Sequence, residues 1–152
     1  MDKSAVLSLD NQLCFALYAC AREVTKLYRP FLDELGITYT QYVTLLALWE
    51  KDGVPVKELG ARLYLDSGTL TPLLKKLEGM SLIRRERDPE DERSVIVRLT
   101  DEGRAMKEQA MTIPERVFCQ MNLPPGQFAV LRDQLQQLTA AVHQSTCGTQ
   151  ES

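Results

Sequence analysis

Apolar residues recur at intervals of three and four along most of the chain, which is the spacing of one helical face. The first such segment predicts a helix from Leu9 that has Cys14 in its interior and ends or kinks near Arg29, because a proline follows. Thr38 and Gln41 have the spacing of a capping box, which predicts the start of the next helix. The predicted helices cover residues 9–35, 38–52, 56–63, 67–78, 100–121 and 128–144.

One segment has the two-residue period of a strand instead. Val95, Val97 and Leu99 alternate with positions that are predicted to face solvent, Ile96 among them. The predicted hairpin comprises strands 82–87 and 93–99 and the charged turn 88–92, and the extended residues 54–56 could add a third strand.

A short helix, a turn, a second helix and a hairpin, in this order, predict a winged helix-turn-helix. Asp66 or Ser67 can cap the second helix, Gly79 suits its C′ position, and Pro72 is expected near its first turn. The predicted fold class is therefore mainly α with a small β-hairpin (α+β), with the winged DNA-binding core at residues 37–100.

Apolar stripes on the terminal helices have no partner in this winged core. The last helix repeats them at spacings of three and four, as in a coiled-coil seam. Residues 9–36 and 101–144 are therefore predicted to interlock in a homodimer, and packing as a bundle inside one chain is the alternative. The prediction is one domain, residues 1–152, with frayed residues 1–8 and a disordered tail at residues 145–152. The apolar seam comprises Phe128, Leu131, Leu135, Leu138 and Val142.

Composition narrows the class of protein without identifying it. No apolar run approaches the ~20 residues of a membrane span and the N-terminus does not resemble a secretory signal, so we expect a cytoplasmic protein without membrane association. The four cysteines are then expected to be thiols at rest, and because their spacing fits no zinc motif, neither a metal nor a cofactor is predicted. The net charge is −3, yet residues 57–98 hold nine basic and eight acidic residues, which gives +1 there and −4 elsewhere.

The second helix of the winged core has side chains that suit the major groove of double-stranded DNA. Small hydroxyl residues near its start allow close approach to base edges and phosphates, and an arginine at a hairpin tip can enter a narrow minor groove. The alternatives are hydroxyls that only cap a helix, and a solvated tip whose four acids repel phosphate unless they pair with Arg87 or Arg93. The candidate DNA-binding residues are Asp66, Ser67, Gly68, Thr69, Thr71, Lys75, Lys76, Arg87 and Arg93.

Two groups of residues resemble a known family. Asp91-Glu92-Arg93, five further residues and Leu99-Thr100 resemble the wing signature of the MarR family of bacterial regulators, and residues 65–78 look like its recognition helix. More narrowly, QLCFALY at residues 12–18 and TYTQY at residues 38–42 resemble its OhrR branch, the organic-hydroperoxide sensors. The specific resemblance covers roughly residues 12 to 100.

This resemblance implies a redox sensor with two cysteines. Cys14 would be the reactive cysteine, whose thiolate attacks a peroxide oxygen to give a sulfenic acid; taken alone, an inert structural thiol is the simpler interpretation. Tyr28 and Tyr39 match two tyrosines that hydrogen-bond the reactive sulfur from the other subunit, with plain packing as the alternative. Cys119 matches, by spacing, the resolving cysteine of an intersubunit disulfide, and Cys147 is the competing resolver.

The predicted function is a redox-sensing, DNA-binding transcriptional repressor that leaves a palindromic operator when organic hydroperoxide oxidises Cys14. One alternative is a repressor of the same fold that a small phenolic or aromatic-acid ligand releases. A thiol peroxidase would be an enzyme, but Cys14 is predicted inside a helix rather than at its N-terminus and no recycling motif is visible, so no enzymatic activity is predicted. A winged helix for protein contacts alone would not need Arg93 at the tip.

Overall fold

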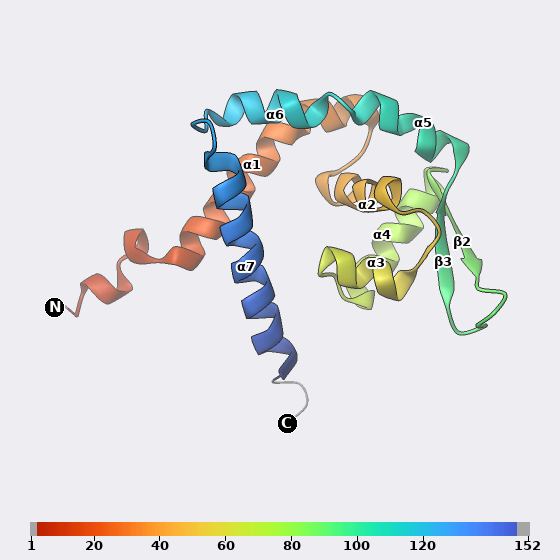
Figure 1. The fold of residues 1–152 in the computed structure, drawn as a ribbon, viewed down its shortest axis with the longest axis horizontal. Coiled ribbons are helices and arrows are strands. Elements are labelled where there is room, and N and C mark those ends of the chain that lie inside the picture. Colours follow the sequence, from red (N-terminus) through yellow and green to blue (C-terminus); the bar gives the residue numbers. More distant parts are fainter. Residues whose placement is uncertain (1–2, 149–152) are drawn as a thin grey trace. The chain divides into compact units, whose positions relative to one another are not determined.

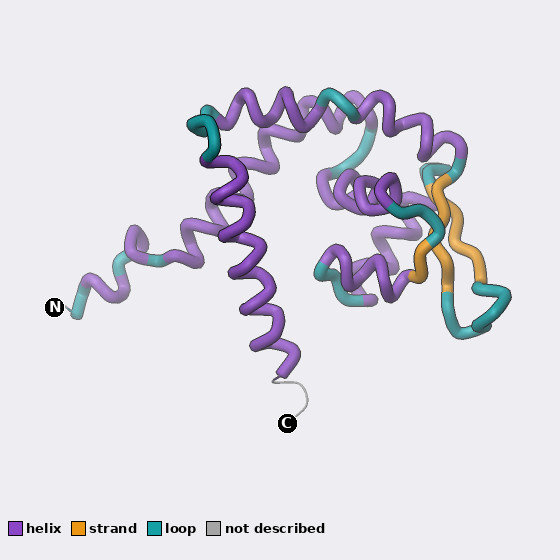
Figure 2. The backbone as a smooth tube through the Cα atoms, viewed as in Figure 1, coloured by secondary structure: helices purple, strands orange, loops and turns teal. Residues whose placement is uncertain are grey.

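The computed structural model describes residues 3–148, which form seven α-helices, two short 3-10 turns and a three-stranded sheet (Figures 1 and 2). The chain divides into two compact units, residues 1–114 and residues 115–152, and each is described by itself. The elements are the 3-10 turns Ala5–Leu7 and Leu9–Asn11, α1 (Leu13–Leu35), α2 (Tyr39–Glu50), β1 (Val54–Pro55), α3 (Val56–Leu63), α4 (Ser67–Gly79), β2 (Ile83–Arg87), β3 (Val95–Leu99), α5 (Asp101–Ala110), α6 (Ile113–Met121) and α7 (Gln127–Gly148).

The first unit contains a winged helix-turn-helix, as predicted. Its three strands lie in the order β1-β3-β2 and are antiparallel, and α4 contacts both α3 and β2 (Figure 1). Burial of large apolar side chains from helices and strands provides the main stabilisation of this core. Its most deeply buried side chains are Leu45, Leu48, Leu59, Leu70, Leu74, Leu77, Ile83 and Val97. The predicted fold class and the predicted third strand are confirmed.

The alternation predicted for the last strand is wrong at Ile96, which is buried rather than solvent-facing. The reason lies in the position of β3 as the central strand of the sheet. Ile96 lies opposite Pro55 of β1 and Glu86 of β2, and directly opposed residues project from the same face of a sheet. Neighbours on both sides therefore cover a position that would be open on an edge strand.

Side-chain caps fix the starts of α2, α4 and α5, whereas α1 and α3 begin without one. Thr38 and Gln41 form the capping box of α2, and the Thr100 hydroxyl accepts a hydrogen bond from the Gly103 amide at the start of α5 (3.0 Å). At the end of α4, Gly79 is still helical and Ser81 has the left-handed conformation (φ +60°), so the prediction for Gly79 is wrong. Pro72 lies in the second turn of α4 rather than the first.

The first helix differs from its prediction at its start and at its proline. It begins at Leu13, because the residues before it form two 3-10 turns and Gln12 has an extended backbone. The side-chain amide of Gln12 donates to the carbonyls of Val6 and Ser8. These bonds hold the first of the two turns, where frayed residues were expected. The helix then runs through Pro30 without ending and closes at Gly36 in the left-handed conformation (φ +70°).

The C-terminal helices also depart from prediction. The helix expected over residues 100–121 is two helices, because Pro114 has no N–H to donate to the carbonyl of Ala110, and the chain turns at Met111 and Thr112. The tail predicted as disordered from residue 145 is helical as far as Gly148, and residues 149–152 lie outside the described residues, as do residues 1–2.

Candidate DNA interface and thiol site

The start of α4 presents the side chains that were predicted to meet DNA. Ser67, Gly68 and Thr69 are exposed and Thr71 is half-buried. The two lysines near the end of the helix, Lys75 and Lys76, are exposed as well. The helix thus offers small hydroxyl groups at one end and positive charge further along, as phosphate and base contacts require.

Asp66 has a structural task at this surface. Its Oδ1 accepts a hydrogen bond from the backbone N–H of Thr69 at 2.7 Å, which caps α4. That bond, together with the Thr69 side chain and the Gly68 amide, holds the pKa of Asp66 below its usual range. The carboxylate therefore positions the first turn of the helix.

A groove between α4, α3 and the wing brings several predicted DNA-binding residues together. It has a volume of about 680 Å³, and Ser67 and Thr71 of α4 line it from one side. Arg93 and Asp91 of the wing line it as well. Ser67 and Thr71 of the recognition helix lie at least twenty residues from Asp91 and Arg93 in the sequence, yet all four line one groove.

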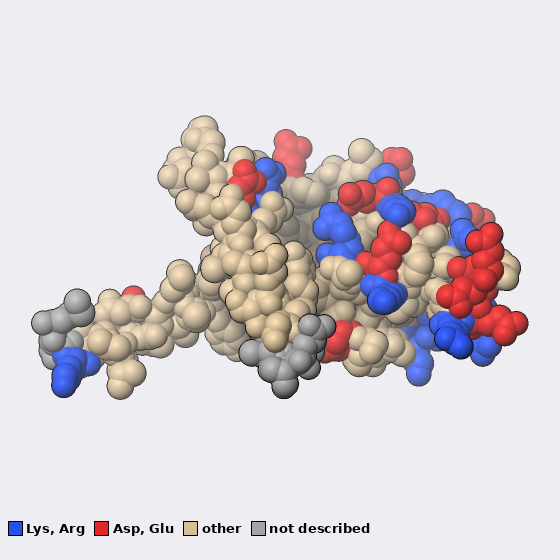
Figure 3. Space-filling view, turned by 60° about the horizontal axis from the view of Figure 1, so that its bottom comes forward, with Lys and Arg blue, Asp and Glu red and all other residues tan. Residues whose placement is uncertain are grey.

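The acids of the wing tip are organised by backbone hydrogen bonds rather than by arginines. Asp88 accepts from the Glu90 amide at 2.9 Å, and Asp91 accepts from the Arg93 amide at 3.1 Å. In the part of the chain that the structure describes, neither Arg87 nor Arg93 forms an ion pair with an acid. The pairing that would neutralise these acids is therefore absent there, and both guanidinium groups remain available. Figure 3 shows acidic and basic side chains interspersed on the face drawn, so charge alone marks no DNA surface on that face.

A clamp that the sequence did not suggest joins α4 to the wing. Glu78, near the end of α4, accepts hydrogen bonds from the Arg85 backbone N–H (2.9 Å) and from its guanidinium (3.1 Å). These bonds, the side-chain bond foremost, hold the pKa of Glu78 below its usual range. We name this pair the Glu78–Arg85 clamp. It fixes the base of the wing against the recognition helix.

Cys14 is the second residue of α1, and its side chain is exposed. The expectation that it lies in the interior of a helix, away from the N-terminus, is therefore wrong, and with it one argument against a thiol peroxidase. The first turn of a helix has backbone N–H groups without partners and favours negative charge. Exposure also contradicts a buried, inert thiol. Cys20, further along the same helix, is exposed too.

Three tyrosines form a cluster between α1 and α2. The ring centroid of Tyr28 lies 5.0 Å from that of Tyr39 and 5.6 Å from that of Tyr42. Burial raises the pKa of all three hydroxyls, that of Tyr42 to about 12, and the neighbouring rings add to the shift in Tyr28 and Tyr42. The hydroxyls therefore stay protonated and can donate hydrogen bonds. Sequence reasoning missed Tyr42, although its three-residue spacing from Tyr39 on one helix was a signal.

The other two cysteines lie in the second unit. Cys119, on α6, is exposed. Cys147 is exposed near the end of α7, where its Sγ lies 3.6 Å from His143 Nε2. The structure therefore leaves both proposed resolving thiols open to solvent.

A membrane-spanning helix and a metal-holding group of side chains are both absent from the described residues. Among residues 3–148, no helix is long and apolar enough to cross a membrane. Over the same residues, no group of three or more histidine, cysteine or carboxylate side chains is arranged to hold a metal ion.

Comparison with known proteins gives the family. A family model described as transcriptional regulator SarA/Rot matches residues 26–110. The chain is also 49% identical over 138 residues to the organic hydroperoxide resistance transcriptional regulator of Bacillus subtilis (strain 168), which covers 91% of this chain and 94% of that protein. The chain belongs to the MarR and SarA/Rot family of transcriptional regulators. The resemblance to MarR proteins, and to their organic-hydroperoxide branch, is thereby confirmed.

Solved structures support the same family assignment. Reduced AbfR bound to DNA is 36% identical, with a TM-score of 0.74 over 92% of this chain and 97% of that one. AbfR with its disulfide formed is 37% identical, with a TM-score of 0.61 over 90% of this chain and 96% of that one. AbfR is a protein of Staphylococcus epidermidis. Family members thus have solved structures in more than one redox state.

Proposed function

We propose that this chain is a dimeric, DNA-binding transcriptional repressor that organic hydroperoxide releases from a palindromic operator through oxidation of Cys14. The observation that carries the proposal is an exposed thiol in the first turn of α1, in a chain 49% identical to an organic-hydroperoxide regulator. A repressor acts where the operator lies, so we assign the protein to the cytoplasm. The protein is similar to several transcriptional regulators, and we propose no enzymatic turnover.

Exposed apolar side chains support the dimer. On α1, Leu13 is 65% exposed, and on α7, Phe128 and Leu135 are 42% and 38% exposed. Solvent-facing apolar stripes at helical spacing destabilise a lone chain, and a second copy can bury them across a two-fold axis. The same axis would place two recognition helices on the two half-sites of a palindrome.

The sensing chemistry is a two-electron oxidation of sulfur. The Cys14 thiolate attacks the outer peroxide oxygen of ROOH, the O–O bond breaks, and the products are Cys14 sulfenic acid and an alkoxide that takes up a proton to become the alcohol. Cys14 and Tyr28 are fourteen residues apart on α1, roughly 21 Å at ~1.5 Å per residue, so they cannot meet within one chain. We therefore assign Tyr28 and Tyr39 to the sulfur of the partner subunit, where their protonated hydroxyls can donate to a thiolate.

Release from DNA follows when the sulfenic acid condenses with a second thiol, losing water and forming a disulfide. We assign this resolving role to Cys119 of the other subunit, with exposed Cys147 as the competitor. A disulfide draws two Cα atoms to within about 7 Å. A bond between terminal helices of two subunits would therefore shift the helices that connect the winged cores, and the recognition helices would lose their half-site spacing.

Two cysteine variants test this proposal. Cys14→Ser is expected to fold and bind operator DNA but to ignore cumene hydroperoxide. Cys119→Ser is expected to form the sulfenic acid at Cys14 yet give no dimer crosslinked through Cys14. The measurements are gel shifts with the protein's own upstream DNA, non-reducing electrophoresis, and mass mapping after one equivalent of peroxide.

The outcomes separate the alternatives. A Cys14→Ser protein that peroxide still releases would overturn the sensor assignment, and a crosslink through Cys147 would move the resolving role there. Steady-state consumption of peroxide would indicate a thiol peroxidase instead. Release by a phenolic acid without oxidation of any cysteine would indicate the ligand-responsive type of repressor.

A further inference from the structure

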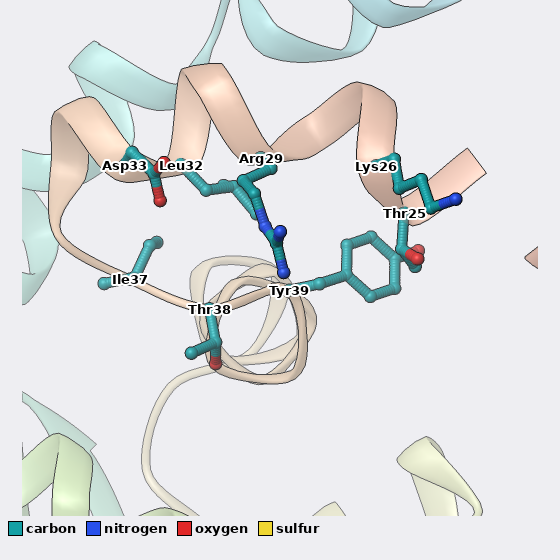
Figure 4. A pocket seen from close by; sticks show the side chains of 8 residues that line it. All are labelled: Thr25, Lys26, Arg29, Leu32, Asp33, Ile37, Thr38 and Tyr39. Carbon is teal, nitrogen blue, oxygen red and sulfur yellow. The ribbon is translucent and has the colours of Figure 1, made fainter. Parts of the chain in front are cut away.

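A pocket at the corner between α1 and α2 lies beside the tyrosine cluster, and Figure 4 shows its lining. We name it the corner pocket; its volume is about 320 Å³. Tyr39 is one of its walls, while the same ring lies 5.0 Å from Tyr28 in the cluster. The pocket and the cluster that we assign to the sensor sulfur therefore share a side chain.

The corner pocket has one available cation. Lys26 lines it, but its ammonium is paired with Glu23 at 2.8 Å, and the hydroxyl of Thr25 donates to the Arg22 carbonyl at 2.9 Å. Arg29 has no ion pair or hydrogen bond from its guanidinium within the described residues. In Figure 4 this guanidinium extends from α1 toward the start of α2, next to Tyr39. An unpaired guanidinium can bind a carboxylate with two parallel hydrogen bonds.

The rest of the lining selects the kind of anion. Leu32 and Ile37, which are 2% and 4% exposed, provide an apolar floor, and the Tyr39 ring adds an aromatic wall. Asp33 also lines the pocket, and in Figure 4 it lies on the far side of Arg29 from Tyr39. A cation beside apolar walls suits an organic anion with an apolar body better than a fully hydrated inorganic one.

We propose that the corner pocket receives the carboxylate of an anionic organic hydroperoxide, so that the sensor reacts faster with hydroperoxides that carry a carboxylate than with their neutral esters. This inference rests on the proposed function, because it directs the peroxide group toward Tyr39 and hence toward the sulfur that we assign to that tyrosine. Arg29 binds the carboxylate, and the apolar floor holds the body of the molecule. The oxidation itself is unchanged, with the alcohol as the product of the peroxide.

The test compares two peroxides that differ in one charge: cumene hydroperoxide bearing a para-carboxylate, and its methyl ester. The measured quantity is the ratio of their rates of sulfenic acid formation at Cys14, followed by mass spectrometry in the full-length Cys119→Ser protein. One charge-assisted hydrogen-bonded pair at a partly exposed site corresponds to roughly a tenfold preference for the acid. The preference should shrink as salt rises, because the pocket opens to solvent.

Variants assign that preference to Arg29. Arg29→Ala should bring the ratio close to one, Arg29→Lys should keep part of it, and Asp33→Asn should raise it by removing a repelling charge. Arg22→Ala is the matched control, since Arg22 lies on the same helix but stacks over Tyr18 and does not line the pocket. It should leave the ratio unchanged. The ester rate in each variant reports whether the sensor itself is intact.

The two hypotheses fail in different ways. If acid and ester oxidise Cys14 equally fast in the parent protein, or if Arg29→Ala keeps the preference, the corner pocket is not the carboxylate site although the sensor stands. If Arg22→Ala and Arg29→Ala lower the acid-to-ester rate ratio equally, the preference is a general effect of charge. This result would likewise refute the corner pocket as the carboxylate site. If neither peroxide oxidises Cys14, the proposed function itself fails.

Discussion

Replacing Glu78 by glutamine would break the clamp between the recognition helix and the wing. Glu78 uses both carboxylate oxygens, one for the Arg85 amide and one for its guanidinium. Glutamine keeps one acceptor oxygen, which can accept only one of these two hydrogen bonds. Its NH₂ group takes the place of the other oxygen and faces an N–H of Arg85, so the second hydrogen bond is lost. The Arg85 Nε already lacks a partner within the described residues, so the site has no spare acceptor.

The expected loss in the free energy of unfolding is about 1–2 kcal/mol. A hydrogen bond to a charged group contributes about 1.5–3 kcal/mol, and solvent screening reduces this because the side chains of Arg85 and Glu78 are 27% and 38% exposed. The matched control is Glu86→Gln, since Glu86 pairs with Arg98 at 3.2 Å and both side chains are about half exposed. Such a surface pair contributes only about 0.2–1 kcal/mol. Urea unfolding at equal protomer concentration measures the loss in the free energy of unfolding for both variants.

Acid pH provides a second measure of the same clamp. The folded-state pKa of Glu78 lies below its ordinary value of 4.5, so the stabilisation is present above 4.5 and is lost as pH falls through the lower folded value. The difference between parent and Glu78→Gln should therefore be constant near neutral pH and shrink below pH 4.5. Equal losses in the free energy of unfolding for Glu78→Gln and Glu86→Gln would refute this account of the clamp. A difference between the parent and Glu78→Gln that persists at low pH would refute it as well.

Three further changes test other parts of the molecule. Arg93→Ala should weaken operator binding and lower the slope of log affinity against log salt by about one, measured by fluorescence anisotropy; an unchanged slope would remove the wing tip from the interface. Tyr39→Phe should slow Cys14 oxidation by cumene hydroperoxide about tenfold, the value of one hydrogen bond to a thiolate, whereas Tyr18→Phe, at an exposed ring outside the cluster, should not. Deleting residues 124–152 removes the exposed apolar face of α7, so sedimentation should show loss of the dimer, and a stable dimer would contradict this role.

The local elements could be predicted because their signals are local. Thr38 and Gln41, and Thr100 with the amide three residues on, specify helix starts through hydrogen bonds that span one turn. The order of helix, helix and hairpin predicted the winged fold, because helices and strands differ in their hydrophobic period. Several helix ends were placed wrongly, since the extended backbone of Gln12 and the missing N–H of Pro114 are features that the apolar pattern does not record.

The candidate site was predicted in its residues but not in its arrangement. The sequence singled out Cys14, Tyr28 and Tyr39 through their resemblance to a known family, whereas Cys14 taken alone favoured an inert thiol. Only the tertiary structure decided that Cys14 is exposed in a first turn and that the tyrosines, eleven residues apart in the chain, stack with Tyr42.

The same division holds for the charged groups. Sequence shows which residues carry charge, but distance and burial decide which charges are already paired. Glu78 and Arg85 form an ion pair, and Asp91 accepts a hydrogen bond from the wing backbone, while Arg29 lines a pocket with an apolar floor. Coulomb energy and desolvation depend on positions in space, so the chemistry of each charge was fixed only when packing brought distant segments together.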